Sequence, residues 1–352
     1  MSNTLVIQYK CPSCGADMTF DAKSGTLLCE SCGNTLPVEN YPVPDFEEFT
    51  EETTTSTFES ESAKQYYCNN CGAVLITDGD TSATTCSFCG APMILADRLT
   101  GELAPAKIIP FEITKEQAQE AFQKWCKKGR LTPKGFMNAE RIKNITGIYV
   151  PFWLYDLNGQ GEVKANCTKV YRREDSNYIY TDTHHYEVYR KVDLNYLKIP
   201  ADASAKMNDE MMDKLEPFHY DNLKEFKVPY LAGYIAEKYN YTDKDLLPRV
   251  KQRVEEYVND YIKSLINGYD TITYRHNWID VKQRNAYYTL IPVWMICYDY
   301  KDSEHTFAMN GQTGKVVGKP PISKKKVCGW FFGVSSIVFL ILELLLIIGG
   351  AL

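Results

Sequence analysis

Eight of the twelve cysteines stand in four CxxC pairs, and their spacing constrains the fold more than any other feature. The pairs form two units of the same pattern, C-x2-C-x14-C-x2-C, offset by 57 residues: Cys11, Cys14, Cys29 and Cys32, then Cys68, Cys71, Cys86 and Cys89. A repeat of this kind is typical of a tandem duplication. Four thiolates at such spacing are the usual ligands of a structural, tetrahedral Zn²⁺ ion. We therefore predict two zinc ribbons with one structural Zn²⁺ each.

The chemistry leaves two alternatives to zinc open. Iron accepts the same four thiolates, and CxxC pairs also occur as redox-active dithiols. The N-terminus carries no apolar signal segment, so we expect reduced thiols in the cytosol rather than disulfides. Each unit is too small to hold a core of its own, so the metal is expected to supply its folding free energy. In the second unit we expect the spacer to form a β-hairpin around Asp78-Gly79.

The two units resemble zinc ribbons of the TFIIB type over residues 9–42 and 66–96, and such ribbons often bind nucleic acid. The charges argue against that role here. Residues 1–98 hold 4 Lys/Arg against 14 Asp/Glu, whereas phosphate binding needs clustered cations. We predict a first ribbon at 1–42, an acidic linker at 43–65 and a second ribbon at 66–98. The linker is expected to be extended, so that both ribbons are separate recognition modules on a flexible tether.

The segment at 327–352 is apolar apart from Glu343 and follows a basic stretch at 321–326 with three consecutive lysines. About 20 helical residues cross a bilayer core, so this segment predicts a single transmembrane helix. The lysines place the preceding domains in the cytoplasm by the positive-inside rule. A carboxyl group inside a membrane is costly, so we expect Glu343 to pair with a polar group of another subunit or of a second copy. A tolerated, protonated Glu343 is the alternative. The expected location is the cell membrane.

Residues 99–320 are expected to form a soluble α+β domain rich in tyrosine. A capping box at Thr114 predicts one helix, and apolar periodicity predicts others at 207–215 and about 245–266, the last with Tyr257 and Tyr261 on its core face. Strands are expected at 163–170, 178–180 and 185–192, and a hairpin at 307–317. The runs at 148–156 and 290–299 resemble each other around a Pro-x-Trp, which indicates two related halves. The fold class is thus multidomain: two small zinc ribbons with four cysteine ligands each, a central α+β domain and one transmembrane helix.

Catalytic motifs do not stand out. The chain has no HExxH, nucleophile elbow or dinucleotide fingerprint, and Gly311-Gln312-Thr313-Gly314-Lys315 lacks the spacing of a phosphate-binding loop. We therefore expect no catalytic or cofactor-binding residues.

Two acidic ribbons, a tyrosine-rich body and a C-terminal span together resemble the bacterial TFIIB-type zinc-ribbon-containing membrane proteins. That resemblance implies an adaptor that recruits proteins to the membrane in envelope stress, with phage-shock-protein-A-like or flotillin-like (SPFH) partners. The expected pairing of Glu343 would give a homo- or hetero-oligomer formed through the span. Two alternatives remain. The first is a membrane-tethered nucleic-acid-binding protein that uses a basic face made by Lys169, Arg172, Arg173, Arg190 and Lys191. The second is an enzyme whose site in the central domain has no recognisable motif.

Overall fold

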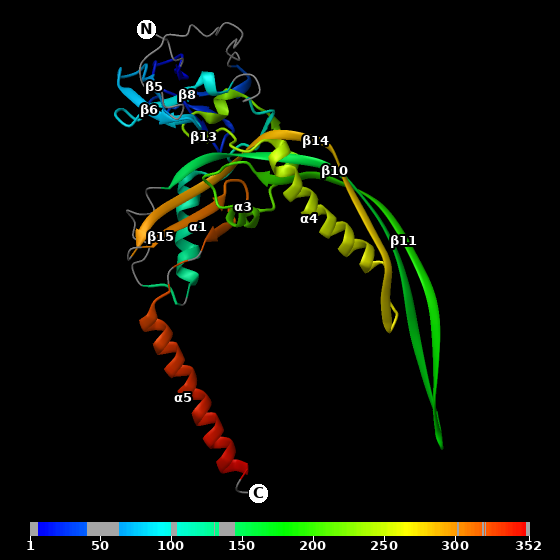
Figure 1. Cartoon of the computed structure of the whole chain (residues 1–352). Coiled ribbons are helices and arrows are strands. Elements are labelled where there is room, and N and C mark those ends of the chain that lie inside the picture. Colours follow the sequence, from blue (N-terminus) through cyan, green and yellow to red (C-terminus); the bar gives the residue numbers. More distant parts are fainter. Residues whose placement is uncertain are drawn as a thin grey trace.

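The computed structural model of the chain describes residues 6–40, 63–99, 104–129, 131–133, 145–300, 303–318, 320 and 322–349. The molecule consists of a sheet-rich body with the ribbons at one end, a long curved arm of β-strands and a C-terminal helix (Figure 1). Most of the expected acidic linker at 43–65 lies outside the described residues, so its conformation stays a prediction.

The strands of the two ribbons belong to different sheets. In the first ribbon, β2 (Thr19–Asp21), β3 (Thr26–Leu28) and β4 (Thr35–Leu36) form a small antiparallel sheet. The second ribbon holds β5 (Ala63–Tyr67), β6 (Val74–Asp78), β7 (Thr81–Thr85) and β8 (Pro92–Leu95). Here β5 pairs with β6, whereas β7 lies between β8 and a strand of the body. The second ribbon is therefore built into the central sheet.

The predicted hairpin around Asp78-Gly79 is wrong in its pairing, although the chain does turn there. The Asp78 carboxylate accepts hydrogen bonds from the backbone N–H groups of Asp80 and Thr81, at 3.3 and 3.1 Å, which shapes the turn. Both edges of β7 are occupied by β8 and the body strand, so β6 pairs with β5 instead.

The central sheet has eleven strands in the part of the chain that the structure describes, and its longest members run through the whole body. In addition to β7 and β8 it contains β1 (Val6–Ile7), β9 (Lys107–Ile108), β10 (Thr146–Asp175), β11 (Tyr178–Asp202), β12 (Lys224–Glu225), β13 (Ile235–Glu237), β14 (Thr271–Tyr300), β15 (Ser303–Asn310) and β16 (Val316–Gly318). The strands β10 and β14 pair along most of their length and contain the two similar Pro-x-Trp runs. The hairpin expected at 307–317 is present as β15 and β16.

The arm is the part of three strands that extends beyond the body: 157–175 of β10, 178–197 of β11 and 271–283 of β14 (Figure 1). Its strands curve, and both ladders shift register at one level, while the β10–β14 ladder shifts again between Lys164 and Ala165. Opposite Asp156, β11 and β14 each carry one extra residue, so the register of both ladders with β10 shifts at this point. At this level Lys198 has a φ of 58°, and its N–H donates to Asp156 Oδ1 at 3.0 Å. Bulges of this kind bend a sheet, which explains where the arm turns away from the body.

Helix α4 (Asp243–Ser264) covers one face of the arm. Its capping box joins Thr242 and Asp245, and its buried stripe of Val250, Val254, Val258 and Ile262 packs on the sheet. Gly159 and Gly161 make room for this helix, since a Cβ at Gly159 would lie 2.5 Å from Val258 Cγ2. The expected helix is confirmed, but Tyr257 and Tyr261 are exposed rather than in its core face. The buried stripe instead ends at Ile262 and begins at Leu246.

Among the described residues, the body has two further α-helices and several short turns of 3₁₀-helix. The predicted capping box opens α1 (Lys115–Lys128), where Thr114 accepts from the Gln117 N–H and Gln117 accepts from the Thr114 N–H. Helix α3 (Asp209–Leu215) begins after an Asn208 cap. The 3₁₀-helices span Val38–Asn40, Ala96–Arg98, Tyr220–Asn222 and Val228–Leu231.

The first ribbon is packed against the body rather than held apart from it. Phe20 lies edge-on to Tyr230 with ring centroids 5.2 Å apart, and Tyr234 stacks on Phe111 at 4.2 Å. These rings belong to one continuous core that also holds Cys29. The expectation of two separate modules on a tether is therefore wrong for the described ribbon residues. The apolar side chains of the first ribbon are buried by packing against the body.

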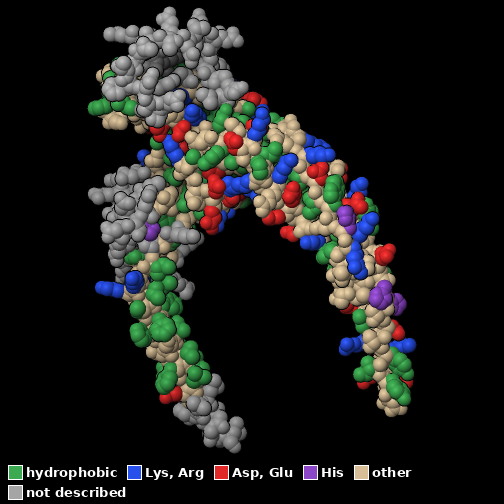
Figure 2. Space-filling view, in the orientation of Figure 1, with side chains coloured by type: hydrophobic (Ala, Val, Ile, Leu, Met, Phe, Trp, Pro, Cys, Tyr) green, Lys and Arg blue, Asp and Glu red, His purple; other side chains and the backbone are tan. Residues whose placement is uncertain are grey.

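Helix α5 (Lys324–Gly349) is the one candidate membrane span among the described residues. Its Lys324–Glu343 window has a mean hydropathy of 1.6, and its side chains from Val327 to Glu343 are exposed. The helix projects from the body as an apolar rod (Figures 1 and 2). An unburied apolar helix of this length fits a single-pass anchor, as the sequence predicted.

Candidate metal centres

Each ribbon brings its four cysteines to one point. The four Sγ atoms of each set, Cys11, Cys14, Cys29 and Cys32 or Cys68, Cys71, Cys86 and Cys89, lie within 4.8 Å of one another. The nearest pairs are separated by 3.5 to 3.8 Å. A tetrahedron with metal–sulfur bonds of about 2.3 Å has sulfur atoms roughly 3.8 Å apart. The geometry therefore fits a four-coordinate metal ion at both centres.

The backbone turns that aim the thiols depend on glycine. Gly15 and Gly33 follow the second cysteine of each pair in the first ribbon, with φ of 77° and 75°, and Gly72 and Gly90 repeat this at 75° and 73°. Each glycine N–H donates to the carbonyl of the first cysteine of its pair, which closes the turn. Only glycine adopts this left-handed backbone at little cost, as the repeated Cys-Gly pattern predicted.

Hydrogen-bond donors favour the thiolate at two of the sulfurs, Cys11 and Cys89, whereas neighbouring thiols raise the pKa of Cys14, Cys32 and Cys71. Burial raises the pKa of the Cys11 thiol, but N–H groups of Ser13 and Cys14 and the amide of Asn34 outweigh it and lower that pKa to about 6. At Cys89, the Ala91 N–H and the Asn70 amide lower the pKa to about 6. Asn34 Nδ2 lies 3.7 Å from Cys11 Sγ, and Asn70 Nδ2 lies 3.6 Å from Cys89 Sγ. Such donors hold metal-bound sulfurs in place.

The two centres are linked by the chain that precedes the first of them. Strand β1 pairs with β8 of the second ribbon, and Asn69 Nδ2 donates to Val6 O at 2.9 Å. Gln8 Nε2 lies 3.9 Å from Cys68 Sγ, and Lys10 Nζ lies 3.4 Å from Asn70 Oδ1. The N-terminal strand therefore completes the second ribbon, a contact that no motif in the sequence signals.

Each centre has a buried side and an open side. Cys11, Cys29, Cys68 and Cys86 are buried, whereas the second cysteine of each pair is exposed. A metal ion here would be anchored in the body on one side and would present the CxxC turns to solvent on the other. Two four-cysteine sites suited to metal are thus present, while the identity of the metal as Zn²⁺ stays a prediction.

The residues expected to form a basic face do not share one. Side chains alternate along a strand, so Lys169, Arg173 and Arg190 lie on the face that α4 covers, and Arg172 and Lys191 lie on the opposite face. Arg190 is further engaged, because its Nε donates to Leu265 O at 3.2 Å. The split weakens the case for a continuous phosphate-binding surface.

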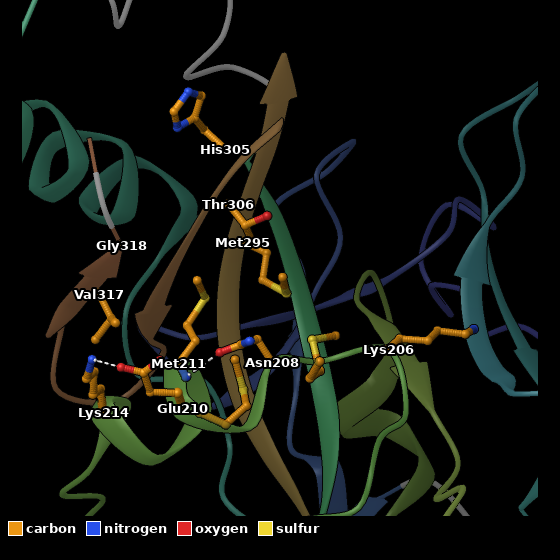
Figure 3. Close-up of a pocket in the computed structure, with 12 residues that line it drawn as sticks. Lys206, Asn208, Glu210, Met211, Lys214, Met295, His305, Thr306, Val317 and Gly318 are labelled. Atoms are coloured by element: carbon orange, nitrogen blue, oxygen red, sulfur yellow. Dashed lines mark hydrogen bonds and ion pairs between the residues drawn. The ribbon is translucent and has the colours of Figure 1, made fainter. Parts of the chain in front are cut away.

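A groove of about 530 Å³ runs between α3 and the β15–β16 edge of the body. Met207, Met211 and Met295 line it, together with His305 at one end, whose ring points away from the methionines (Figure 3). Lys214 is paired with Glu210 at 2.5 Å rather than turned inward (Figure 3). Methionines give a soft apolar lining without acid–base chemistry.

Comparison with known proteins gives one strong relationship. The chain is 56% identical over 347 residues to the uncharacterized protein YdjG of Bacillus subtilis (strain 168), covering 98% of this chain and 99% of that protein. The chain belongs to the YdjG family. No protein-family model matches it, and no solved structure does. The length match means that both ribbons, the arm and the apolar helix fall within the region shared with YdjG.

Proposed function

We propose that this member of the YdjG family is a membrane-anchored adaptor whose zinc ribbons hold protein partners at the cytoplasmic face of the cell membrane. The observation that carries the proposal is an apolar patch on the second ribbon. Tyr67, Val74 and Ile76 share one face of the β5–β6 hairpin, because Tyr67 pairs with Val74 and Ile76 lies two residues further on. All three are exposed, Ile76 to 69%. We call these three residues the ribbon patch.

A fourth apolar residue lies in the metal-binding turn itself. Phe88, between Cys86 and Cys89, is 76% exposed. Large apolar side chains gathered on a polar protein usually mark a site where another protein docks. Aromatic anchors supply much of the binding energy at such sites. A metal centre that shapes the turn around Phe88 would therefore control the docking surface directly.

The apolar helix α5 supports the same proposal. With α5 in the bilayer and the three lysines on the cytoplasmic side, the ribbons face the cytoplasm. The resemblance to bacterial TFIIB-type zinc-ribbon membrane proteins then proposes the partners: phage-shock-protein-A-like or flotillin-like proteins of an envelope-stress system. Glu343, which is exposed on α5, remains our candidate for pairing with another membrane subunit.

The test is co-purification from native membranes in mild detergent. Wild type is compared with Ile76→Asp, Phe88→Asp and the matched control Ser87→Asp, which changes an exposed neighbour in the same turn. Metal content of each variant reports whether the ribbon is still folded. Partners that are lost from the first two variants and kept by the control support the adaptor. An unchanged partner list in all four metal-loaded proteins refutes docking through the second ribbon.

A further inference from the structure

Both edges of the arm lack a further strand among the described residues, but only the ladder at the β11 edge is free of bulges within the arm. Strand β11 pairs with β10, and no other strand among the described residues pairs with it. A long open edge presents a row of N–H and C=O groups that can pair with another strand. From 181 to 196 the β10–β11 ladder is free of bulges, so this stretch is regular. We call residues 181–197 of β11 the open edge.

The hydrogen bonds of the arm show which residues of the open edge face outward. Asp270 N donates to Thr168 O at 2.9 Å, and the Asp270 carboxylate accepts from Val170 N, so even-numbered residues of β10 face β14. Odd-numbered residues of β10 then face β11, where they oppose the even-numbered residues of the open edge. The backbone groups of the odd-numbered residues, Tyr189 among them, consequently point away from the arm.

The same odd-numbered residues carry charged and polar side chains on the face opposite α4. His185, Glu187, Tyr189, Lys191 and Asp193 are all exposed and alternate with side chains on the α4 face, of which Val188 and Val192 are buried. Pairing two copies about a two-fold axis at Tyr189 sets Glu187 against Lys191 and His185 against Asp193, twice each. Moving the axis by one residue in either direction breaks both Glu187–Lys191 pairs, and in one direction it opposes Glu187 to Asp193. Opposite charges across a strand pair stabilise it, and like charges destabilise it.

We propose that two copies of this chain associate by antiparallel pairing of their open edges, centred on Tyr189. The two Tyr189 residues face each other across the axis and exchange main-chain hydrogen bonds. The Tyr189 carbonyl, which now accepts from Arg190 Nη1 at 2.9 Å, takes a backbone N–H instead. Two exposed apolar side chains also meet: Leu197 opposes Thr181 of the second copy, whose Ile179 is the diagonal neighbour.

The arrangement leaves room for the rest of the molecule. Antiparallel arms place the two bodies at opposite ends of the joined sheet. The two α4 helices lie over strands β10, which are three strand spacings or roughly 14 Å apart, whereas a helix is about 10 Å wide. Two chains in one membrane require the two-fold axis along the membrane normal, with the arms parallel to the surface.

Helix α5 can adapt to that orientation. Its start is held to the body by hydrogen bonds from Ser323 N to Leu131 O and from Lys326 Nζ to Thr132 O. Beyond Lys326 its side chains up to Glu343 are exposed. The pairing requires the span to turn toward the membrane about its start, which leaves the sheet unchanged.

Cysteine cross-linking of the full chain in native membranes tests the register. In Tyr189→Cys the two Cα atoms would be about 5.5 Å apart, within the range for a disulfide. Glu187→Cys and Lys191→Cys are matched controls on the same face, but each residue lies roughly 13 Å from its own copy, too far for a disulfide. Under mild oxidation we expect a dimer of twice 40.2 kDa from Tyr189→Cys, with at least about tenfold less from either control. Co-expression of the two controls should restore the dimer band.

A charge exchange tests the same contact without a new cysteine pair. In the Tyr189→Cys chain, Lys191→Glu should reduce the cross-linked fraction, and adding Glu187→Lys should recover it. Equal cross-linking at 187, 189 and 191 would mean random collision and would overturn the proposal. A cross-linked band of another mass would assign the edge to a different protein, and the absence of a dimer from Tyr189→Cys would show that the open edges do not pair.

Discussion

The docking of the first ribbon on the body can be tested at Phe20. Its ring is 4% exposed and packs against Tyr230 and, more distantly, Tyr234. Replacing a buried phenylalanine by alanine typically costs about 3 to 5 kcal/mol. We take about 3 kcal/mol for Phe20→Ala, because the ring lies between two units that can partly close the gap. For a domain of this size that loss lowers the melting temperature by roughly 6 to 12 °C.

The assay is thermal unfolding of the full chain in detergent with saturating Zn²⁺, followed by near-ultraviolet circular dichroism of the aromatic core. Trp294 reports on the body, since its ring lies 5.0 Å from Phe111 in the same cluster. The control is Phe88→Ala, an exposed ring on the second ribbon, which should change stability by less than about 0.5 kcal/mol. An unchanged body transition in Phe20→Ala would contradict the docking of the first ribbon on the body, because it would mean that the ribbon unfolds on its own.

Three further predictions concern the metal, a buried carboxyl group and the arm. Cys29→Ser should lower the metal content from two ions per chain to one, measured by plasma mass spectrometry, while Cys126→Ser, outside both clusters, should keep two. Burial raises the pKa of Asp202 from 3.8 to about 7, so its contribution to stability is complete below about pH 4 and is lost as the pH rises to about 7. In urea titrations Asp202→Asn should therefore flatten the fall in unfolding free energy between about pH 4 and 7. Gly159→Ala should cost about 1 to 3 kcal/mol by clashing with Val258 under α4, and Val258→Ala in the same chain should recover part of it; additive losses would argue against the contact.

Local signals in the sequence predicted the local structure well. The CxxC spacing predicted two clusters of four cysteines, and each cluster is formed. The capping box at Thr114 begins α1, and the 26-residue apolar segment is the helix α5 apart from its ends. These features depend on residues close together in the chain, so short stretches of sequence are enough to predict them.

The arm and the docking of the ribbons depend on distant residues, and the sequence did not predict them. The strands expected at 163–170 and 185–192 are short pieces of β10 and β11, because polar residues on the uncovered face hide how far each strand continues. Phe20 gave no signal that it would meet Tyr230, more than 200 residues away. The exposure of Tyr257 shows the same limit, since helical spacing alone does not tell which side of a tyrosine-rich helix meets the sheet.

The arm also fixes the order in which its strands can pair during synthesis. Strands β10 and β11 are adjacent in the chain and can pair as soon as Asp202 has emerged, but β14 begins 69 residues later at Thr271. At about 5 to 20 residues per second, the β14 side of β10 stays bare for roughly 3 to 14 seconds on each ribosome. Helix α4 is made within that interval and can cover the apolar face first. If two nascent chains meet at this stage, the bare edge of β10 in one can pair with a strand of the other. Expression rate and chaperone supply should therefore determine what fraction of this protein forms its native sheet.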